Sequence, residues 1–171
     1  MEGFNIINPE EVNESIFKLI GNDWMLITAG TPDKYNTMTA SWGGFGVLWR
    51  KKVSFIFVRP ERYTYEFLES SNNFTLSFFN ESYREALNFC GTKSGRDVDK
   101  AANTGITPVS EEEGKVFFNE AKLVVVCKKM YFQDFKPENF LDKSIESLYN
   151  GTGYHRMYVG EIEKCYLNTK G

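Results

Sequence analysis

Apolar and polar residues alternate in several short stretches of the chain, and this pattern predicts a mainly β fold. Residues 52–59, KVSFIFVR, place apolar side chains at alternating positions, and residues 23–30, DWMLITAG, form an apolar run typical of a buried strand. The predicted strands are residues 23–30, 35–49, 52–59, 73–80, 121–135 and 155–167. Short turns such as TPDKY join most of them, so we expect a β-barrel with helices inserted at the strand ends.

Other segments show helical spacing or helix-start signals. The predicted helices are residues 10–20, 64–70, 82–90 and 137–149, with a short helix in the Gly-rich, charged region 91–114. Gly21 should end the first helix, Ser82 is the expected N-cap of the third, and Leu141, Ile145 and Leu148 should share one face of the fourth. The stretch GGFG does not fit the GxGxxG pattern, which disfavours a dinucleotide-binding βαβ fold.

Length and composition indicate one packed domain spanning residues 1–171. Apolar residues make up 42% of the chain, and an aromatic fraction of 16% suits a β-rich core or a ligand site with flat walls. The net charge of −3 argues against a nucleic-acid binder. We expect no signal peptide and no membrane segment, because the N-terminal segment is acidic and no apolar run is long enough to span a bilayer.

The cysteines and the single histidine limit the available chemistry. Cys90, Cys127 and Cys165 are odd in number and widely spaced, which argues against a disulfide framework or a zinc site and favours a reducing cytoplasm. Because His155 is the only histidine, a multi-histidine metal centre is excluded. His155 could serve as a catalytic base, although a lone histidine at the start of a strand is more often a structural hydrogen-bonding residue.

The segment NTMTASW carries a row of small hydroxyl side chains. In an extended strand, side chains alternate between the two faces. The two faces then carry Thr37, Thr39 and Ser41, and Met38, Ala40 and Trp42, respectively. A strand with hydroxyls, backbone groups and a terminal indole suits a flat heterocycle with a polar edge. The alternative is an edge strand whose hydroxyls face solvent while the indole fills the core.

Residues 59–67, RPERYTYEF, form a candidate anion site. Arg59 and Arg62 precede a predicted helix start at Thr64, where unpaired N–H groups and the helix dipole favour a phosphate. The arginines could add bidentate contacts. The alternative is a surface turn with solvated arginines, and Glu61 and Glu66 weaken the positive field there.

Residues 90–105 form a second candidate for binding an anion. The small, flexible and basic residues of this segment are Lys93, Ser94, Gly95, Arg96 and Lys100. The alternative is a mobile polar loop with charge pairs such as Asp97 with Lys100.

Together these segments resemble the flavin reductase family of FMN-binding split β-barrels, particularly its flavoredoxin-like branch. The matching stretches are NTMTASW, VSFIFVRPERYTYEFL, CGTKSGRDVDK and HRMYVGEI, in the family's order. The resemblance implies an antiparallel, Greek-key-like split barrel that forms a homodimer, with one FMN per subunit near the dimer interface. The chain departs from many two-component members where GGFGVLWRKK replaces a loop with DPP-like residues.

The resemblance also implies roles for individual residues. The residues implied to bind FMN are Thr37, Met38, Thr39, Ala40, Ser41, Trp42, Arg59, Arg62, Tyr63, Thr64, Lys93, Ser94 and Lys100. Residues 37–42 would form the strand against the isoalloxazine, with residues 39–41 addressing its polar edge largely through backbone groups. Residues 59–64 and 93–100 would address the phosphate and ribityl side. His155 matches a histidine near the reactive face.

The activity implied by the resemblance is hydride transfer from the nicotinamide C4 of NADH or NADPH to flavin N5. Such chemistry requires positioning and charge stabilisation, and it needs no covalent nucleophile or general base. His155 could shape the nicotinamide side or protonate the reduced flavin. The main alternative is a flavoredoxin-like FMN electron carrier that is reduced by a redox protein partner and has no nicotinamide site. A third is a split barrel that has lost flavin and acts as a dimeric binding protein.

Overall fold

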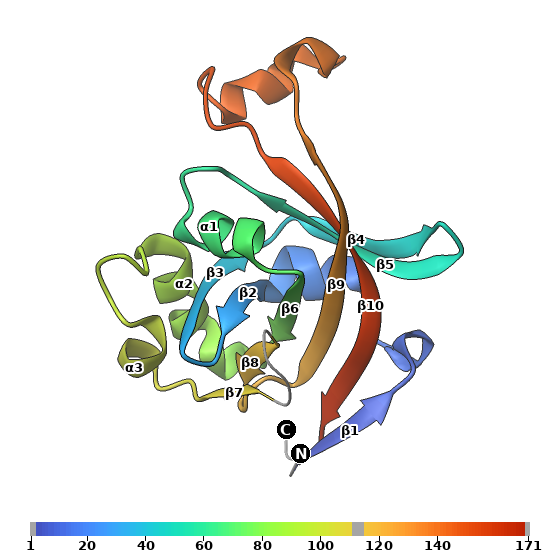
Figure 1. Cartoon of the computed structure of the whole chain (residues 1–171), viewed down its shortest axis with the longest axis vertical. Helices are drawn as coiled ribbons and strands as arrows, with labels where there is room; N and C mark the ends of the chain where they lie inside the picture. Colours follow the sequence, from blue (N-terminus) through green and yellow to red (C-terminus); the bar gives the residue numbers. More distant parts are fainter. Residues whose placement is uncertain (1–2, 111–114, 170–171) are drawn as a thin grey trace.

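A strongly curved antiparallel sheet dominates the computed structural model, which describes residues 3–110 and 115–169 (Figure 1). The strands run in the order β3-β2-β6-β9-β10-β5-β4, and β1 also pairs with β10. These strands are β1 (Phe4–Ile7), β2 (Met25–Thr31), β3 (Lys34–Ala40), β4 (Gly43–Leu48), β5 (Lys51–Val58), β6 (Asn73–Phe78), β9 (Leu123–Asp134) and β10 (Arg156–Asn168). A separate small sheet pairs β7 (Pro108–Ser110) with β8 (Val116–Phe118).

The two ends of the strand order are consecutive in sequence. Only Ser41 and Trp42 separate β3 from β4, so the sheet must curl round to bring its outermost strands near one another. Gly43 permits this sharp passage, because a Cβ atom there would lie 2.9 Å from the Phe55 carbonyl oxygen of the neighbouring strand. This antiparallel architecture is that of a split β-barrel, as predicted.

Three α-helices gather beside β2 and β3 (Figure 1). They are α1 (Tyr63–Ser70), α2 (Arg84–Thr92) and α3 (Lys100–Thr104). The 3-10 and π-helical turns of the described chain are η1 (Pro9–Glu11), η2 (Lys18–Asp23), η3 (Glu81–Tyr83), η4 (Pro137–Asn139) and η5 (Lys143–Leu148). Within residues 3–110 and 115–169, no helix is long and apolar enough to cross a membrane.

Strand β9 shows how an unbroken apolar run becomes the centre of the fold. Its first half, LVVVC, is buried throughout. Leu123 and Val125 belong to the core inside the barrel, whereas Val124 and Val126 belong to a second apolar cluster that includes Leu87 of α2. Because side chains alternate across a strand, a run buried on both faces holds the barrel and the helical layer together.

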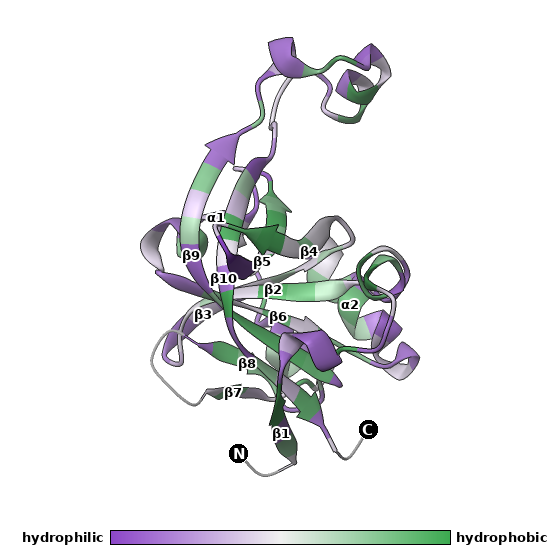
Figure 2. Cartoon of the chain, turned by 90° about the vertical axis from the view of Figure 1, so that its right-hand side faces the viewer, coloured by the Kyte–Doolittle hydropathy of each residue, from purple (hydrophilic) through white to green (hydrophobic). Residues whose placement is uncertain are grey.

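The far halves of β9 and β10 extend past the other strands and carry a projecting segment, residues 135–155, here called the arm (Figure 1). Hydrophobic and hydrophilic residues are interspersed along the arm (Figure 2). Its first residue is held against the barrel, since the Phe135 ring lies 5.5 Å from that of Phe57 on β5. The backbone N–H of Phe135 also donates to the carbonyl of His155, which closes the base of the arm.

Most of the predicted strands are confirmed. Residues 23–30, 52–59, 73–80, 121–135 and 155–167 correspond to β2, β5, β6, β9 and β10. The predicted strand 35–49 is instead two strands, and the break falls at Ser41 and Trp42. Strands β1, β7 and β8 were not predicted, because each has only three or four residues.

Two predicted helices are wrong. Residues 10–20 do not form one helix: a capping box between Asn8 and Glu11 fixes a single 3-10 turn, and the next helical turn includes Gly21 rather than ending there. Residues 137–149 form η4 and η5, and Leu141 of the expected apolar face is 98% exposed. Ser82 lies within η3 and is not an N-cap, because α2 begins at Arg84.

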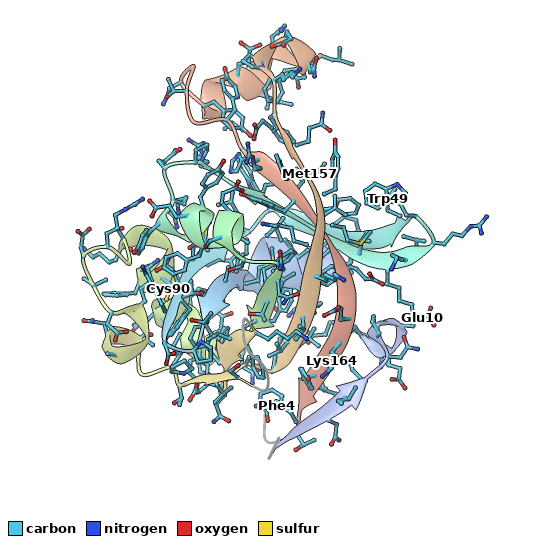
Figure 3. The ribbon with its side chains drawn as sticks, viewed as in Figure 1. Phe4, Glu10, Trp49, Cys90, Met157 and Lys164 are labelled. Atoms are coloured by element: carbon cyan, nitrogen blue, oxygen red, sulfur yellow. The ribbon has the colours of Figure 1, made fainter. Side chains whose placement is uncertain are left out.

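The three cysteines are buried and unpaired. Figure 3 shows Cys90 between the helices and the sheet. Cys127 and Cys165 belong to the barrel core, where the Cys127 thiol lies 3.2 Å from the Ser54 hydroxyl.

Candidate functional site

A groove formed by two adjoining hollows runs from the end of β3 to the start of α1. The first hollow, of about 220 Å³, is lined by Thr39, Ala40, Ser41, Trp42, Phe57, Arg59, Gly91 and His155. The second, of about 230 Å³, is lined by Asn36, Glu61, Tyr63, Thr64, Thr92, Lys93, Ser94, Gly95 and Lys100. Met38 and Arg62 line both. All of the predicted site residues except Thr37 therefore border one groove, whose combined size is in the range of a small-molecule site.

The hydroxyls of β3 mostly fasten the strand and do not form an open polar face. Thr37 is buried, with its hydroxyl 2.9 Å from that of Thr28 and 3.2 Å from the Ile27 carbonyl oxygen to which it donates. The hydroxyl of Thr39 donates to the Leu87 carbonyl of α2. Neighbouring backbone carbonyls thus take the hydrogen of both hydroxyls, while Thr39 still lines the first hollow.

The backbone of β3 is better placed than its hydroxyls to bind a ligand. Strand β3 pairs with β2 and is the last strand in the sheet order, so its other edge has no strand partner among the described residues. The Thr37 carbonyl points to that edge, where it accepts a hydrogen bond from Lys100. Since the amide and carbonyl of every second residue point the same way, those of Thr39 also face the free edge beside the groove.

The start of α1 borders the second hollow. Its N-cap is Arg62, whose side chain makes no capping hydrogen bond, so the first amides of the helix lack a side-chain acceptor. Tyr63 and Thr64, the first two residues of α1, line the hollow. Such a helix end favours an anion through its N–H groups and dipole.

Arg62 lies between the two hollows and is partly anchored. Its guanidinium donates to the Gly91 carbonyl oxygen at 2.9 Å. Burial, together with the charge of Arg59, lowers the pKa of this guanidinium, although it stays protonated at any physiological pH. Arg62 therefore brings a fixed positive charge to the centre of the groove.

Lys100 forms part of the wall and acts as a structural tie. Its ammonium is buried and donates to the carbonyls of Thr37 and Cys90, each at 2.7 Å. Burial lowers its pKa to about 8. The alternative pairing of Asp97 with Lys100 is not the contact observed.

The loop around Ser94 is packed tightly against the strand. A Cβ atom on Gly95 would lie 1.9 Å from the Asn36 side-chain oxygen, so only glycine fits there. The Asn36 amide in turn donates to the Thr64 hydroxyl at 2.7 Å. These contacts join the loop, β3 and α1 into one rigid corner, and they leave Lys93 exposed at its rim.

Arg59 lies in the first hollow, away from Lys93 and Ser94 in the second. Its guanidinium donates to the Leu148 carbonyl at 2.7 Å and sits 5.0 Å from the centre of the Tyr149 ring. Its expected grouping with the phosphate-side residues stays a prediction, and one of its N–H groups is already engaged by the arm.

His155 ends the first hollow. It is 8% exposed, its Nδ1 atom lies 2.8 Å from the Tyr149 hydroxyl, and its ring centre lies 5.2 Å from that of Trp42. Burial and the charge of Arg59 lower the pKa of His155 to about 4. The imidazole is therefore neutral near pH 7.

Sequence reasoning missed Asn36, Phe57, Gly91 and Tyr149. Phe57 was treated only as part of a strand, and Tyr149 as the end of a helix. No spacing pattern connects Tyr149 to the groove, because its position depends on the fold of the arm. In the described parts of the chain, no cluster of three or more metal-ligating side chains occurs.

A family model described as the flavin reductase like domain matches residues 17–171, which is most of the chain. The chain belongs to the flavin reductase like family. Comparison with curated proteins gives no significant sequence match.

Solved structures share the fold of this flavin reductase like chain. Flavoredoxin from Methanosarcina acetivorans superposes with a TM-score of 0.69 at 20% identity, covering 86% of this chain and 69% of that one. Flavoredoxin of Desulfovibrio vulgaris (Miyazaki F) gives 0.66 at 21% identity, with 86% and 70% covered. Nitrilotriacetate monooxygenase component B from Bacillus cereus gives 0.67 at 16% identity, with 96% and 81% covered.

Proposed function

We propose that the groove binds FMN and that the protein is an FMN-dependent oxidoreductase, with NAD(P)H:flavin reductase as its most direct activity. The observation that carries the proposal is the groove itself. One of its ends has an indole, a phenyl ring and strand backbone, and the other has a helix start and basic side chains. FMN combines a flat heterocycle with a phosphate, so its two ends match the two hollows.

The donor set fits a phosphomonoester at the second hollow. Tyr63 and Thr64 at the helix start, the hydroxyl-bearing Ser94 and the basic Lys93 all border it. Arg62 adds a positive charge that is already fixed by Gly91. We assign these groups to the phosphate, because charge-assisted donors on rigid elements bind such a group strongly.

The first hollow fits the flavin ring system. Trp42 and Phe57 supply flat apolar surface, and the backbone of residues 39–41 supplies hydrogen-bonding groups for a polar ring edge. Bound FMN would supply the redox chemistry, as acceptor of a hydride from NADH or NADPH. The residues of this hollow orient the ring and limit water access on one side. His155 is neutral and contributes hydrogen bonding and packing, so it is not a proton donor at pH 7.

A flavoredoxin-like electron carrier is the second candidate, and the exposure of Trp42 favours it. Trp42 is 46% exposed at the rim of the groove, so a redox protein could approach the site closely. In this case the donor is a protein and no nicotinamide site exists.

The first experiment is a visible absorption spectrum after incubation with FMN and desalting. Retained flavin bands support the FMN site, whereas a flat spectrum together with no FMN fluorescence quenching contradicts it. Anaerobic mixing of the loaded protein with NADH, NADPH or a reduced ferredoxin then separates the two candidates. Fast bleaching by a nicotinamide supports the reductase; bleaching by the protein donor alone supports the carrier.

We also propose that the chain is a single domain that acts as a homodimer in the cytoplasm. Exposed apolar side chains on the β4–β5 hairpin and on β9 support the dimer. They are Val47, Trp49 and Tyr131. The Trp49 and Tyr131 rings lie 6.0 Å apart, so they belong to one surface. Three unpaired cysteines are consistent with a reducing compartment.

A further inference from the structure

Tyr149 is an arm residue whose side chain contacts His155 at the end of the groove. It is 3% exposed although it comes from the projecting arm, and its hydroxyl lies 2.8 Å from Nδ1 of His155. Its ring stacks on Tyr154 with centres 4.9 Å apart, and the Arg59 guanidinium covers it at 5.0 Å. Several groups thus fix this phenol in place.

The direction of the Tyr149–His155 hydrogen bond follows from what else each group can bond. Among the described residues, His155 is the only hydrogen-bond partner of the Tyr149 hydroxyl. If Nδ1 carried the proton, the phenol O–H would be left buried without an acceptor, which is costly. If the phenol donates, both atoms are satisfied and the proton of the neutral imidazole resides on Nε2.

We propose that Tyr149 is a positioning residue that locks His155 in its Nε2–H tautomer and presents that N–H to the groove as a fixed donor. The expected acceptor is a carbonyl oxygen or an unprotonated ring nitrogen of the bound heterocycle. This inference rests on the proposed flavin site for its ligand, but the tautomer itself is a property of the protein alone.

Arg59 supports this arrangement by holding the arm. By bonding the Leu148 carbonyl and covering the Tyr149 ring, Arg59 ties the arm to the end of β5. Arg59 therefore holds Tyr149 in place, and Tyr149 in turn holds the imidazole of His155. A neutral imidazole whose free nitrogen could be donor or acceptor becomes a donor only, which selects ligands with an acceptor at that point.

Nitrogen NMR of the histidine-labelled protein tests the tautomer directly, because the chain has one histidine and so one imidazole signal set. We expect an unprotonated Nδ1 and a protonated Nε2 in the wild type at pH 7. Tyr149→Phe should give a mixture of tautomers. Tyr154→Phe is the matched control, since it removes a hydroxyl from the neighbouring ring and should leave the tautomer unchanged. A wild-type Nδ1–H form, or an unaltered tautomer in Tyr149→Phe, overturns the proposal.

FMN affinity, measured by fluorescence quenching, tests the donor role. Tyr149→Phe should weaken binding by about threefold to tenfold, the usual effect of losing one hydrogen bond. His155→Gln keeps an amide donor and should weaken binding less than His155→Ala, and adding Tyr149→Phe to His155→Gln should cause no further loss. Additive losses in the double variant contradict the mechanism. If the wild type binds no FMN at all, the proposed function fails, while the NMR result still decides the tautomer.

Discussion

The imidazole of His155 lies between the indole of Trp42 and the phenol of Tyr149, almost without solvent. Such surroundings stabilise the neutral ring, because a charged imidazolium would lose its hydration and also face the Arg59 guanidinium. The carboxylate of Glu61 acts in the opposite direction but does not compensate. At the scale of single residues, His155 should therefore make the stability of the fold depend on pH.

The folded-state pKa of about 4 lies below the ordinary value of 6.5, so the unfolded chain binds the His155 proton first as the pH falls. Above pH 6.5 the imidazole is neutral in both states and costs the folded state no stability. As the pH falls from 6.5 towards 4, protonation of His155 in the unfolded chain lowers the free energy of unfolding. We expect this residue alone to lower the free energy of unfolding by about 3 kcal/mol across that window. Urea unfolding of wild type and His155→Gln at several pH values measures it. Equal pH slopes for the two proteins would refute the assignment.

Arg62 should distinguish FMN from riboflavin. Arg62→Gln removes a fixed charge beside the second hollow, so the dissociation constant for FMN should rise roughly tenfold or more. Riboflavin, which has no phosphate, should bind both proteins alike in a titration followed by flavin fluorescence. Arg84→Gln is the control, because Arg84 covers Trp24 and bonds the Asn22 carbonyl outside the groove. An equal loss for both flavins would place Arg62 elsewhere in the site.

Much of the candidate site could be predicted from short motifs, whereas side-chain roles could not. The order of motifs identified the residues that border the groove, and the helix start predicted at Thr64 lies one residue from the observed start at Tyr63. The sequence does not reveal that the Thr37 and Thr39 hydroxyls bond to the carbonyls of Ile27 and Leu87, since these contacts depend on how β3 packs against β2 and α2. Tyr149 could not be predicted because its contact with His155 depends on the fold of the arm.

At the scale of elements, the β4–β5 hairpin has an unusual turn. Leu48 pairs with Lys51, so Trp49 and Arg50 form a two-residue loop, with φ angles of 53° and 60°. This left-handed conformation is the one that Asn-Gly turns adopt readily, and it is unfavourable for side chains with a full Cβ substituent. The hairpin retains a Trp and an Arg here, at the edge of the exposed apolar surface where Figure 3 shows Trp49.

Replacing Arg50 by glycine should stabilise the protein. Arg50→Gly removes the unfavourable left-handed backbone energy, and we expect the free energy of unfolding to rise by about 1 kcal/mol. The urea midpoint measures the change. Arg50→Ala keeps the Cβ atom and should give no comparable gain, so a similar rise in both variants would point to loss of the charge instead of relief of the backbone.

Elements with one strong pattern were predicted well, and those that depend on tertiary contacts were not. The apolar runs of β2, β6 and β9 predicted buried strands, and the structure has strands there. Residues 137–149 have the spacing of an amphipathic helix, but Leu141 and Leu148 of its expected apolar face stay exposed in the arm. Local hydrogen bonds, such as the Asp142 cap on Ser144, then select short 3-10 turns.

At the scale of the whole molecule, the exposed apolar surface of β4 and β9 requires a cover. Val47 is 77% exposed and Trp49 is 53% exposed, values that are unusual for neighbouring apolar residues of a monomer. A second copy of the chain could bury them symmetrically.

The double substitution Val47→Asp with Trp49→Asp should convert the dimer into a monomer. Analytical ultracentrifugation should show twice the chain mass for the wild type and the single chain mass for the variant, because two buried carboxylates would oppose association. Ile6→Asp is the control: Ile6 is also exposed, on β1. A wild-type monomer would eliminate the proposed dimer. Dissociation caused by Ile6→Asp would show that the interface includes β1 instead of the β4–β5 hairpin.

The buried cysteines have a consequence for how the protein resists oxidation during the flavin chemistry proposed for it. Reduced flavins that meet oxygen release peroxide, and peroxide attacks thiolates rather than thiols. Burial raises the pKa of Cys90 and of Cys165 to about 11 each, and that of Cys127 still further. At neutral pH almost no sulfur is in the reactive form, and none is accessible, so the folded chain should survive many oxidative cycles without sulfenate formation. Its thiols should react with peroxide only when the barrel unfolds, so their rate of oxidation should report the rate at which the protein unfolds.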